Sequence, residues 1–321
     1  MTADRRQLVI GTRGSKLALW QSDYIKARLE AVTGMPVCVK VIKTTGDRIL
    51  DVPLAKVGGK GLFTKEIEVE LSAGTVDLAV HSMKDVPTEL PDGLMIGAMP
   101  ERVDPRDVIV SGGGHDLDSL PERARLGTSS LRRRSQVLAL RCDLDIVDVR
   151  GNLDTRMRKA EEGEVDAVIL AAAGITRMGW ADRISHYIDP ALMCPAVGQG
   201  SIGVEVRSDD DFMLEVCERL THLETMACVT AERVVMRTLE GGCQVPIGAY
   251  CRFETGALVM DGVVGSVDGT RIVRYHLEGN PAEPDLLGHA MVGRLLELGA
   301  GAILEEIRGA SGGDVSALLQ T

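Results

Sequence analysis

The sequence predicts an α/β fold with two similar α/β domains, followed by a smaller C-terminal α+β domain. Two stretches predict the pair. Gly11-Thr12-Arg13-Gly14-Ser15 and Leu126-Gly127-Thr128-Ser129-Ser130 each follow a short apolar strand and precede a helical pattern. They stand about 115 residues apart. From about Thr221 the pattern changes to one long helix, three strand-like runs and further helices, which is typical of an α+β unit.

The composition is that of a globular protein in a reducing compartment. The 321 residues, 45% of them apolar, suffice for two or three domains with their own cores. Seven cysteines and six histidines are scattered without a Cys-x-x-Cys pair, which argues against a disulfide framework and against a metal site. A net charge of −11 argues against nucleic acid as a partner.

The sequence also predicts a cytoplasmic protein without a membrane partner. The longest apolar run, Ala167–Ala173, is too short to cross a bilayer. The polar stretch Met1–Arg6 leads directly into a strand, with no signal-peptide region.

In the first domain, strands are expected at Leu8–Ile10, Val37–Ile42 and Asp77–Val80. Helices are expected after Ser15, which is predicted to be the N-cap, and at Thr64–Ser72. The third strand delivers His81–Pro87 at its carboxyl end, where open α/β sheets bind ligands. Gly58-Gly59-Lys60-Gly61 lacks the Walker spacing, so we interpret it as a loop that presents Lys56 and Lys60.

The second domain repeats this pattern after a connection at Pro100–Pro105. A helix is expected at Leu131–Leu140, with strands at Asp145–Val149 and Ala167–Ala171. Pro195–Gly200 is interpreted as a return hinge, after which Ile202–Val206 is expected to rejoin the first sheet as its last strand. Each repeated turn presents a helix N-terminus, which favours anions. We expect residues 1–100 with 200–219 as domain 1, 105–195 as domain 2, and 221–321 as the C-terminal domain.

A basic run crosses the second domain. Between Arg125 and Lys159 there are nine basic residues, eight of them arginine, and four acidic ones. One reading is a solvated basic face. The other is a site for carboxylates or phosphates, which arginine binds in a bidentate manner.

Cys243 occupies a loop between a helix and a strand. Gly241 and Gly242 end the helix, and Pro246 prevents it from resuming. Free cysteines are usually small buried hydrophobes, whereas a glycine-flanked loop thiol is open enough to react. This stretch alone does not decide between the two readings.

Asp85 also has two readings. Next to Lys84 it is an ordinary surface ion pair that stabilises little. In a cleft lined by arginines it is a carboxylate able to stabilise a cation formed during a reaction.

Five motifs give the chain a close resemblance to the porphobilinogen deaminase family, over essentially its whole length. They are residues 54–63 (LAKVGGKGLF), 81–87 (HSMKDVP), 127–133 (GTSSLRR), 195–200 (PAVGQG) and 240–246 (EGGCQVP). The resemblance implies a cytosolic, usually monomeric transferase with two domains like those of periplasmic binding proteins and a C-terminal one. It would condense four porphobilinogens head to tail into hydroxymethylbilane, release ammonia, and pass the product to uroporphyrinogen-III synthase.

The resemblance also implies roles for individual residues. Cys243 would carry a dipyrromethane cofactor through a thioether, and Asp85 would be catalytic, with no metal involved. The positions that match residues holding the acetate and propionate groups of cofactor and substrate are Ser15, Lys84, Thr128, Ser130, Arg132, Arg133, Arg150 and Arg156. Those that match residues lining the cleft are Arg13, Phe63, Arg177 and Gln199. Beyond Tyr250 the match is less distinctive.

Two other functions compete with this one. A non-enzymatic anionic-ligand-binding protein of the periplasmic type would explain two domains and hinges, but such proteins are exported and Cys243 would have no role. A thiol hydrolase using Cys243 would need a base, and no histidine has a motif that places it there.

Overall fold

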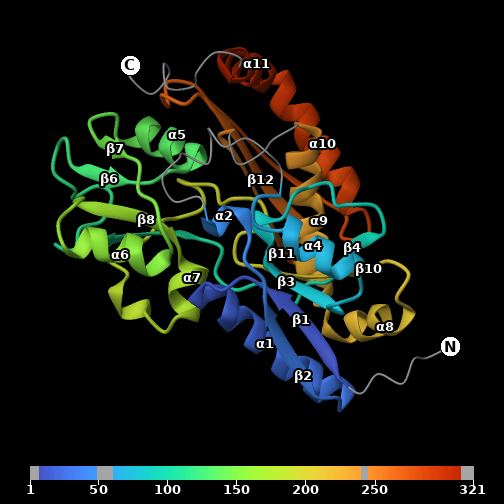
Figure 1. Cartoon of the computed structure of the whole chain (residues 1–321). Helices are drawn as coiled ribbons and strands as arrows, with labels where there is room; N and C mark the ends of the chain where they lie inside the picture. Colours follow the sequence, from blue (N-terminus) through green and yellow to red (C-terminus); the bar gives the residue numbers. More distant parts are fainter. Residues whose placement is uncertain (1–6, 49–60, 240–244, 312–321) are drawn as a thin grey trace. The chain divides into compact units, whose positions relative to one another are not determined.

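The computed structural model describes residues 7–48, 61–239 and 245–311 (Figure 1). Backbone contacts divide the chain into two compact units. Unit 1 comprises Met1–Val103 and Gly200–Met226, and unit 2 comprises Asp104–Gln199 and Ala227–Thr321. The chain therefore passes from one unit to the other three times.

Unit 1 is built on a five-stranded sheet of order β2-β1-β3-β10-β4. Its strands are β1 (Leu8–Thr12), β2 (Val37–Val41), β3 (Leu78–Ser82), β4 (Leu94–Ala98) and β10 (Ile202–Arg207). The first three are mutually parallel, and β10 runs antiparallel to both of its neighbours. β10 is the last of these strands in the chain, yet it lies inside the sheet.

Helices cover both faces of this sheet. α1 (Lys16–Thr33) and α8 (Asp211–Leu220) pack on one face through residues such as Ile25 and Met213. α4 (Lys65–Ser72) covers the other face through Ile67 and Leu71. Two short helices, α2 (Thr45–Arg48) and the 3₁₀ turn η1 (Met83–Asp85), follow the carboxyl ends of β2 and β3.

Unit 2 contains a second five-stranded sheet, of order β7-β6-β8-β5-β9. Its strands are β5 (Asp107–Ser111), β6 (Arg125–Gly127), β7 (Asp145–Val147), β8 (Ala167–Ala171) and β9 (His186–Tyr187). Its helices are α5 (Leu131–Leu140), α6 (Leu153–Glu161), α7 (Ala172–Arg177) and the short η2 (Ala181–Arg183). The two sheets have the same arrangement across their width. Three parallel strands lie side by side, the fourth position is an antiparallel strand (β10 or β5) that the chain forms just after crossing from the other unit, and the fifth is an edge strand.

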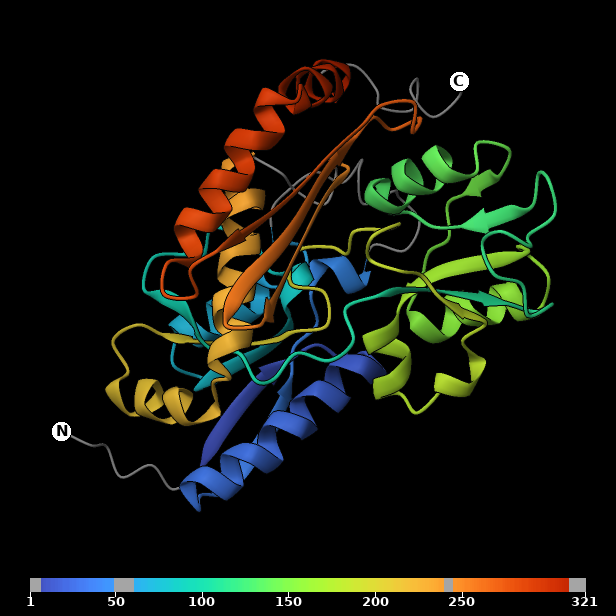
Figure 2. The same ribbon diagram turned by 180° about the vertical axis from the view of Figure 1, so that it is seen from behind.

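The C-terminal part of unit 2 is a three-stranded antiparallel sheet backed by helices (Figure 2). The strands are β11 (Ile247–Glu254), β12 (Ala257–Gly265) and β13 (Ile272–Gly279), and the helices are α9 (Leu223–Thr238), α10 (Pro284–Glu297) and α11 (Ala300–Ser311). Two α/β sheets and a smaller α+β part confirm the predicted fold class. Because α5 packs against β12 and β13, the contacts join the second sheet and the C-terminal part in one unit. The division into three domains stays a prediction.

No single helix within the described ranges is long and apolar enough to cross a membrane. α10 and the stretch to Gly309 reach that length and composition only as a pair, bent by 81°. Likewise, the described residues hold no group of three or more histidine, cysteine or acidic side chains suited to a metal ion.

Candidate functional site

In unit 1, a pocket lies at the carboxyl ends of β1 and β3. These strands are parallel neighbours, so the loop after β1 and the turn after β3 meet at one edge of the sheet. The pocket is open to solvent, and the space in it and at its mouth amounts to about 410 Å³. Arg13, Ser15, Phe63 and Asp85, all predicted site residues, line it together with His81.

Arg13 is fixed on two sides. Its Nη2 lies 2.5 Å from Asp47 Oδ1, and its guanidinium carbon lies 4.1 Å from the centre of the Phe63 ring. Burial raises the pKa of Asp47, but hydrogen bonds from Arg13 and Thr44 outweigh this and lower the pKa below its usual value. A side chain on Gly46 would overlap the Phe63 ring, so only glycine fits there.

Ser15 is the N-cap of α1. Its Oγ accepts the Ala18 N–H at 3.3 Å, which satisfies one of the free donors at the start of the helix. The remaining N–H groups and the helix dipole make this end of the pocket favourable for an anion.

Asp85 and Lys84 belong to η1 but have different surroundings. Asp85 is half-buried and lines the pocket, whereas Lys84 is exposed. The two neighbouring side chains thus differ in exposure. Of the two charged groups in this turn, only the Asp85 carboxylate lines the pocket.

A buried acid–histidine pair lies behind the same pocket. His81 Nε2 is 2.8 Å from Glu205 Oε2, and the two side chains are 4% and 0% exposed. Gln21 on α1 donates from Nε2 to Ser82 Oγ at 2.8 Å, on the other side of β3.

In unit 2, Thr128 and Ser130 shape the start of α5. Ser130 Oγ accepts the Arg133 N–H at 3.4 Å, and Thr128 Oγ1 accepts the Ser130 N–H at 3.2 Å. Ser129 donates to the Val149 carbonyl at 2.9 Å, which brings the loop carrying Arg150 beside this helix start.

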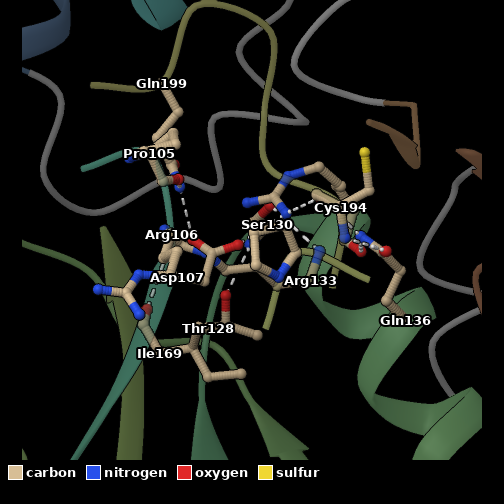
Figure 3. A network of polar contacts seen from close by, with 12 residues as sticks. Pro105, Arg106, Asp107, Thr128, Ser130, Arg133, Gln136, Ile169, Cys194 and Gln199 are labelled. Carbon is tan, nitrogen blue, oxygen red and sulfur yellow. Dashed lines mark hydrogen bonds and ion pairs between the residues drawn. The ribbon is translucent and has the colours of Figure 1, made fainter. Parts of the chain in front are cut away.

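Asp107 is the centre of the polar network at this place (Figure 3). Its Oδ1 accepts from Arg133 Nη2 at 2.7 Å and from Gln199 Nε2 at 2.9 Å, and its Oδ2 lies 2.7 Å from Arg132 Nη1. Asp107 is fully buried, and burial alone would raise its pKa, but the Arg132 and Arg133 guanidinium groups hold it far below its usual value. Two buried cations thus share one buried anion.

Arg132 and Arg133 therefore already have internal partners. Besides Asp107, Arg132 Nη1 donates to the Cys194 carbonyl at 2.6 Å, and Arg133 Nη1 donates to the Ile169 carbonyl at 2.9 Å. Both side chains are buried, in contrast to the solvated face that was one reading of the basic run. Their role in holding ligand carboxylates stays a prediction.

The other predicted residues are more dispersed. Arg156 in α6 donates from Nε to the Gly151 carbonyl at 2.8 Å, and Arg177 is buried in the last turn of α7. Cys243 and the loop with Lys56 and Lys60 lie outside the described residues.

Sequence reasoning missed Asp47, Asp107 and Glu205, and it left His81 without a role. Asp107 and Glu205 gave a signal, because each is an acid within an otherwise apolar strand, in Asp-Val-Ile-Val-Ser and Ile-Gly-Val-Glu-Val-Arg. A buried carboxylate needs a partner, so such positions point to buried networks.

Two family models match the chain. "Porphobilinogen deaminase, dipyromethane cofactor binding domain" matches residues 8–215, and "Porphobilinogen deaminase, C-terminal domain" matches residues 226–297. The chain belongs to the porphobilinogen deaminase family. The predicted transferase function and the dipyrromethane cofactor are thereby confirmed, and the non-enzymatic alternative is not favoured.

Curated relatives agree with this family. The porphobilinogen deaminase of Syntrophobacter fumaroxidans is 55% identical over 94% of this chain and 98% of its own length. That of Desulforudis audaxviator is 53% identical over 95% of this chain and 99% of its own.

Solved structures give more distant similarities. A VFT2 domain of Bordetella pertussis BvgS has a TM-score of 0.41 and 14% identity, over 68% of this chain and 87% of that one. An ancestral arginine-binding protein has a TM-score of 0.37 and 15% identity, over 68% and 92%.

Proposed function

We propose that this chain condenses four porphobilinogen molecules head to tail into hydroxymethylbilane, with Asp85 as the catalytic residue and Cys243 as the attachment point of the dipyrromethane cofactor. The observation that supports the site best is the unit 1 pocket, which combines Asp85 with Arg13 and Ser15. A carboxylate, a guanidinium group and a helix N-terminus are the groups that a pyrrole with an acidic side chain and a developing positive charge requires.

Asp85 acts on the substrate through its charge. Porphobilinogen has two carboxylates and an aminomethyl arm, and loss of ammonia from that arm leaves a cationic azafulvenium. A carboxylate about 4 Å from that cation stabilises it by roughly 4 kcal/mol at an effective dielectric constant near 20. This corresponds to about three powers of ten in rate. The half-buried position of Asp85 limits screening by water.

The residues fit the cofactor as well as the substrate. When bound, the dipyrromethane supplies the free pyrrole α-carbon to which the first substrate is joined. Ser15 and Ser130 open helices whose first N–H groups attract carboxylates, and Arg150 and Arg156 are proposed to add positive charge. Arg132 and Arg133 add a further share, because the single charge of Asp107 leaves the buried pair with a net positive charge.

Four further properties belong to this proposal. We infer a monomeric enzyme that works in the cytoplasm and passes its linear product to uroporphyrinogen-III synthase. The three-domain division, with residues 221–321 as the part that carries Cys243, is proposed with it.

The deciding experiment is the intact mass under denaturing conditions. A thioether survives unfolding, so the wild-type protein is expected to exceed its sequence mass by one dipyrromethane unit. Cys243→Ser should have its sequence mass and no activity. Cys142→Ser is the matched control, since Cys142 is an exposed free thiol elsewhere in the chain, and it should keep both the added mass and the activity. An active wild-type enzyme with an unmodified mass would overturn the assignment.

A further inference from the structure

The unit 1 pocket has a second layer of ionisable groups, which the proposed function leaves unused. Along β3, Val80 faces the core beneath α1, and Ala79 faces the core beneath α4. Side chains alternate along a strand, so His81 follows Ala79 to the α4 side. His81 is among the residues that line the pocket, and its ring contacts Glu205 of β10.

The contact with Glu205 determines which nitrogen of His81 can accept a proton. Glu205 is fully buried, and a buried carboxylate needs a hydrogen-bond donor. A neutral His81 supplies that donor from Nε2, 2.8 Å from Oε2. Nδ1 then carries the lone pair, so the imidazole can take up one proton while it keeps its bond to Glu205.

Glu68 of α4 completes the group, which we call the His81–Glu205–Glu68 trio. Its side chain is only 7% exposed. Burial raises the pKa of Glu68; Thr64 and His81 oppose that rise, and the nearby Glu205 adds to it. Within the described part of the chain, Oε1 of Glu68 and Oε1 of Glu205 have no hydrogen-bond partner. The imidazole of His81 is thus hydrogen-bonded to Glu205 and interacts electrostatically with Glu68, and each carboxylate keeps one oxygen without a hydrogen bond in the described residues.

Other charged groups face the trio from neighbouring elements. Glu66 of α4 acts on Glu68, while Arg13 and Asp85 share the pocket with His81. The charge of Arg13 is largely balanced by Asp47. The charged groups around His81 are therefore predominantly acidic.

We propose that His81 accepts the proton that each condensation releases, with Glu205 and Glu68 as the carboxylates that stabilise it. This inference rests on the proposed function, because it places the reacting rings in the Asp85 pocket. The aminomethyl C–N bond breaks, and ammonia leaves with the bonding pair. The methylene carbon forms a C–C bond with the α-carbon of the acceptor pyrrole. That α-carbon gives its proton to His81 Nδ1, and the C–H electrons restore the aromatic ring. The imidazolium passes the proton to the departing ammonia, so ammonium leaves and the trio is restored.

The first test is His81→Gln, measured as kcat and KM across pH on protein shown by mass to carry its cofactor. Glutamine keeps an N–H donor for Glu205 but has no nitrogen that can be protonated. General base catalysis contributes 10² to 10⁴ in rate, so kcat is expected to fall at least about 100-fold. KM should change by less than about threefold, because substrate binding is untouched. The acidic limb of the profile, which is the fall of kcat toward low pH as the base becomes protonated, should disappear.

The second test separates proton uptake from a structural role. Glu205→Gln removes the charge that stabilises the imidazolium, so the acidic limb should move to lower pH. Glu68→Gln should move it in the same direction by less. Glu70→Gln is the matched control on the same helix. The Glu70 side chain pairs with Lys40 at the surface, so the acidic limb should stay in place. NMR titration of ¹³C-labelled histidine, with the His81 signal assigned by its loss in His81→Gln, should show the same order of midpoints.

The inference fails if His81→Gln retains wild-type kcat, or if the limb and the His81 midpoint stay unchanged in folded Glu205→Gln. If Glu205→Gln does not fold, Glu68→Gln takes its place, since glutamine resembles a protonated glutamate in shape. The inference then fails if the acidic limb and the His81 midpoint stay unchanged in Glu68→Gln. A merely structural role would lower the melting temperature and leave the limb in place. These outcomes are independent of the mass test on Cys243 and of the Asp85 variants, which test the proposed function.

Discussion

Asp85 and Lys84 are adjacent in the chain, but only Asp85 lines the pocket. If Asp85 stabilises a cation, Asp85→Asn keeps the shape and loses the main electrostatic contribution. We expect turnover to fall at least about 100-fold with little change in melting temperature. Asp85→Glu keeps the charge and displaces it by one bond, so it should retain far more activity than Asn. The measurement is single-turnover ammonia release, on variants first shown by mass to carry the cofactor. An Asn variant as fast as the Glu variant would exclude charge stabilisation.

For Asp107 we predict an effect on the free energy of unfolding rather than on turnover. Asp107→Asn leaves Arg132 and Arg133 buried without their anion, and breaking a buried pair of this kind costs about 3–5 kcal/mol. The pKa of Asp107 is lowered in the folded state, so its stabilisation is complete above the unfolded pKa and is lost as pH falls below it. Urea titrations should therefore show a constant difference from wild type between about pH 5 and 7 and a smaller one near pH 3. A difference that grows on acidification contradicts this network.

The sequence identified the polar residues at the ends of strands but not the partners that hold them. Arg132 and Arg133 were expected to bind ligand carboxylates, and the structure pairs them with Asp107, which comes from a strand entered 25 residues earlier in the chain than Arg132. Such a pairing depends on which strands become neighbours. That is decided by sheet order, and local patterns do not contain it.

At the scale of elements, the repeated turn before α1 and α5 was the strongest signal, because a strand, a cap and a helix start are local features. Ser15 and Ser130 do cap these helices. The edge strand β9, with two residues, and the insertion of β10 between β3 and β4 were not predicted. The position of each of these strands depends on pairing between segments far apart in the chain. A hydrophobic pattern predicts that a segment is a strand, but it does not predict which strands lie beside it.

The start of α5 allows capping to be separated from ligand binding. Ser130→Ala removes the side chain that accepts the Arg133 N–H and should lower the free energy of unfolding by about 1 kcal/mol. Ser130→Asp keeps a good cap, so the stability should remain close to wild type. It also adds a negative charge where ligand carboxylates are proposed to bind, so the fraction of protein carrying the cofactor should fall. Urea titration and intact mass give the two readouts. Complete loading of Ser130→Asp would remove the helix start from the proposed binding site.

At the scale of the whole molecule, the segment through which the chain first enters unit 2 is hydrogen-bonded to the segment through which it leaves that unit. Gln199, the last residue before the return to unit 1, donates to the Pro105 carbonyl at 2.7 Å and to Asp107 at 2.9 Å. The first segment to enter unit 2 and the last to leave it thus meet beside the buried arginines. Glu232 on α9 accepts the Gly198 N–H at 2.7 Å and the Cys251 N–H at 2.8 Å, which connects the same exit segment to β11. A change at Asp107 is therefore expected to affect both the segment that first enters unit 2 and the segment that leaves it.

The cysteines provide a test of the covalent cofactor that covers the entire chain. Of seven cysteines, the six in the described ranges are free thiols. Burial raises the pKa of Cys194 and of Cys217 to about 12, so neither should react in the folded protein at neutral pH, whereas exposed Cys142 should.

Unfolding should expose every thiol that is not chemically blocked. If Cys243 carries a thioether, reduced and unfolded wild-type enzyme should react with six equivalents of a maleimide reagent. Cys243→Ser should also give six, and Cys142→Ser should give five, because it loses a reactive thiol while Cys243 stays blocked. A seventh reactive thiol in unfolded, fully active wild-type enzyme would show that Cys243 is free, and the cofactor would then need another attachment point.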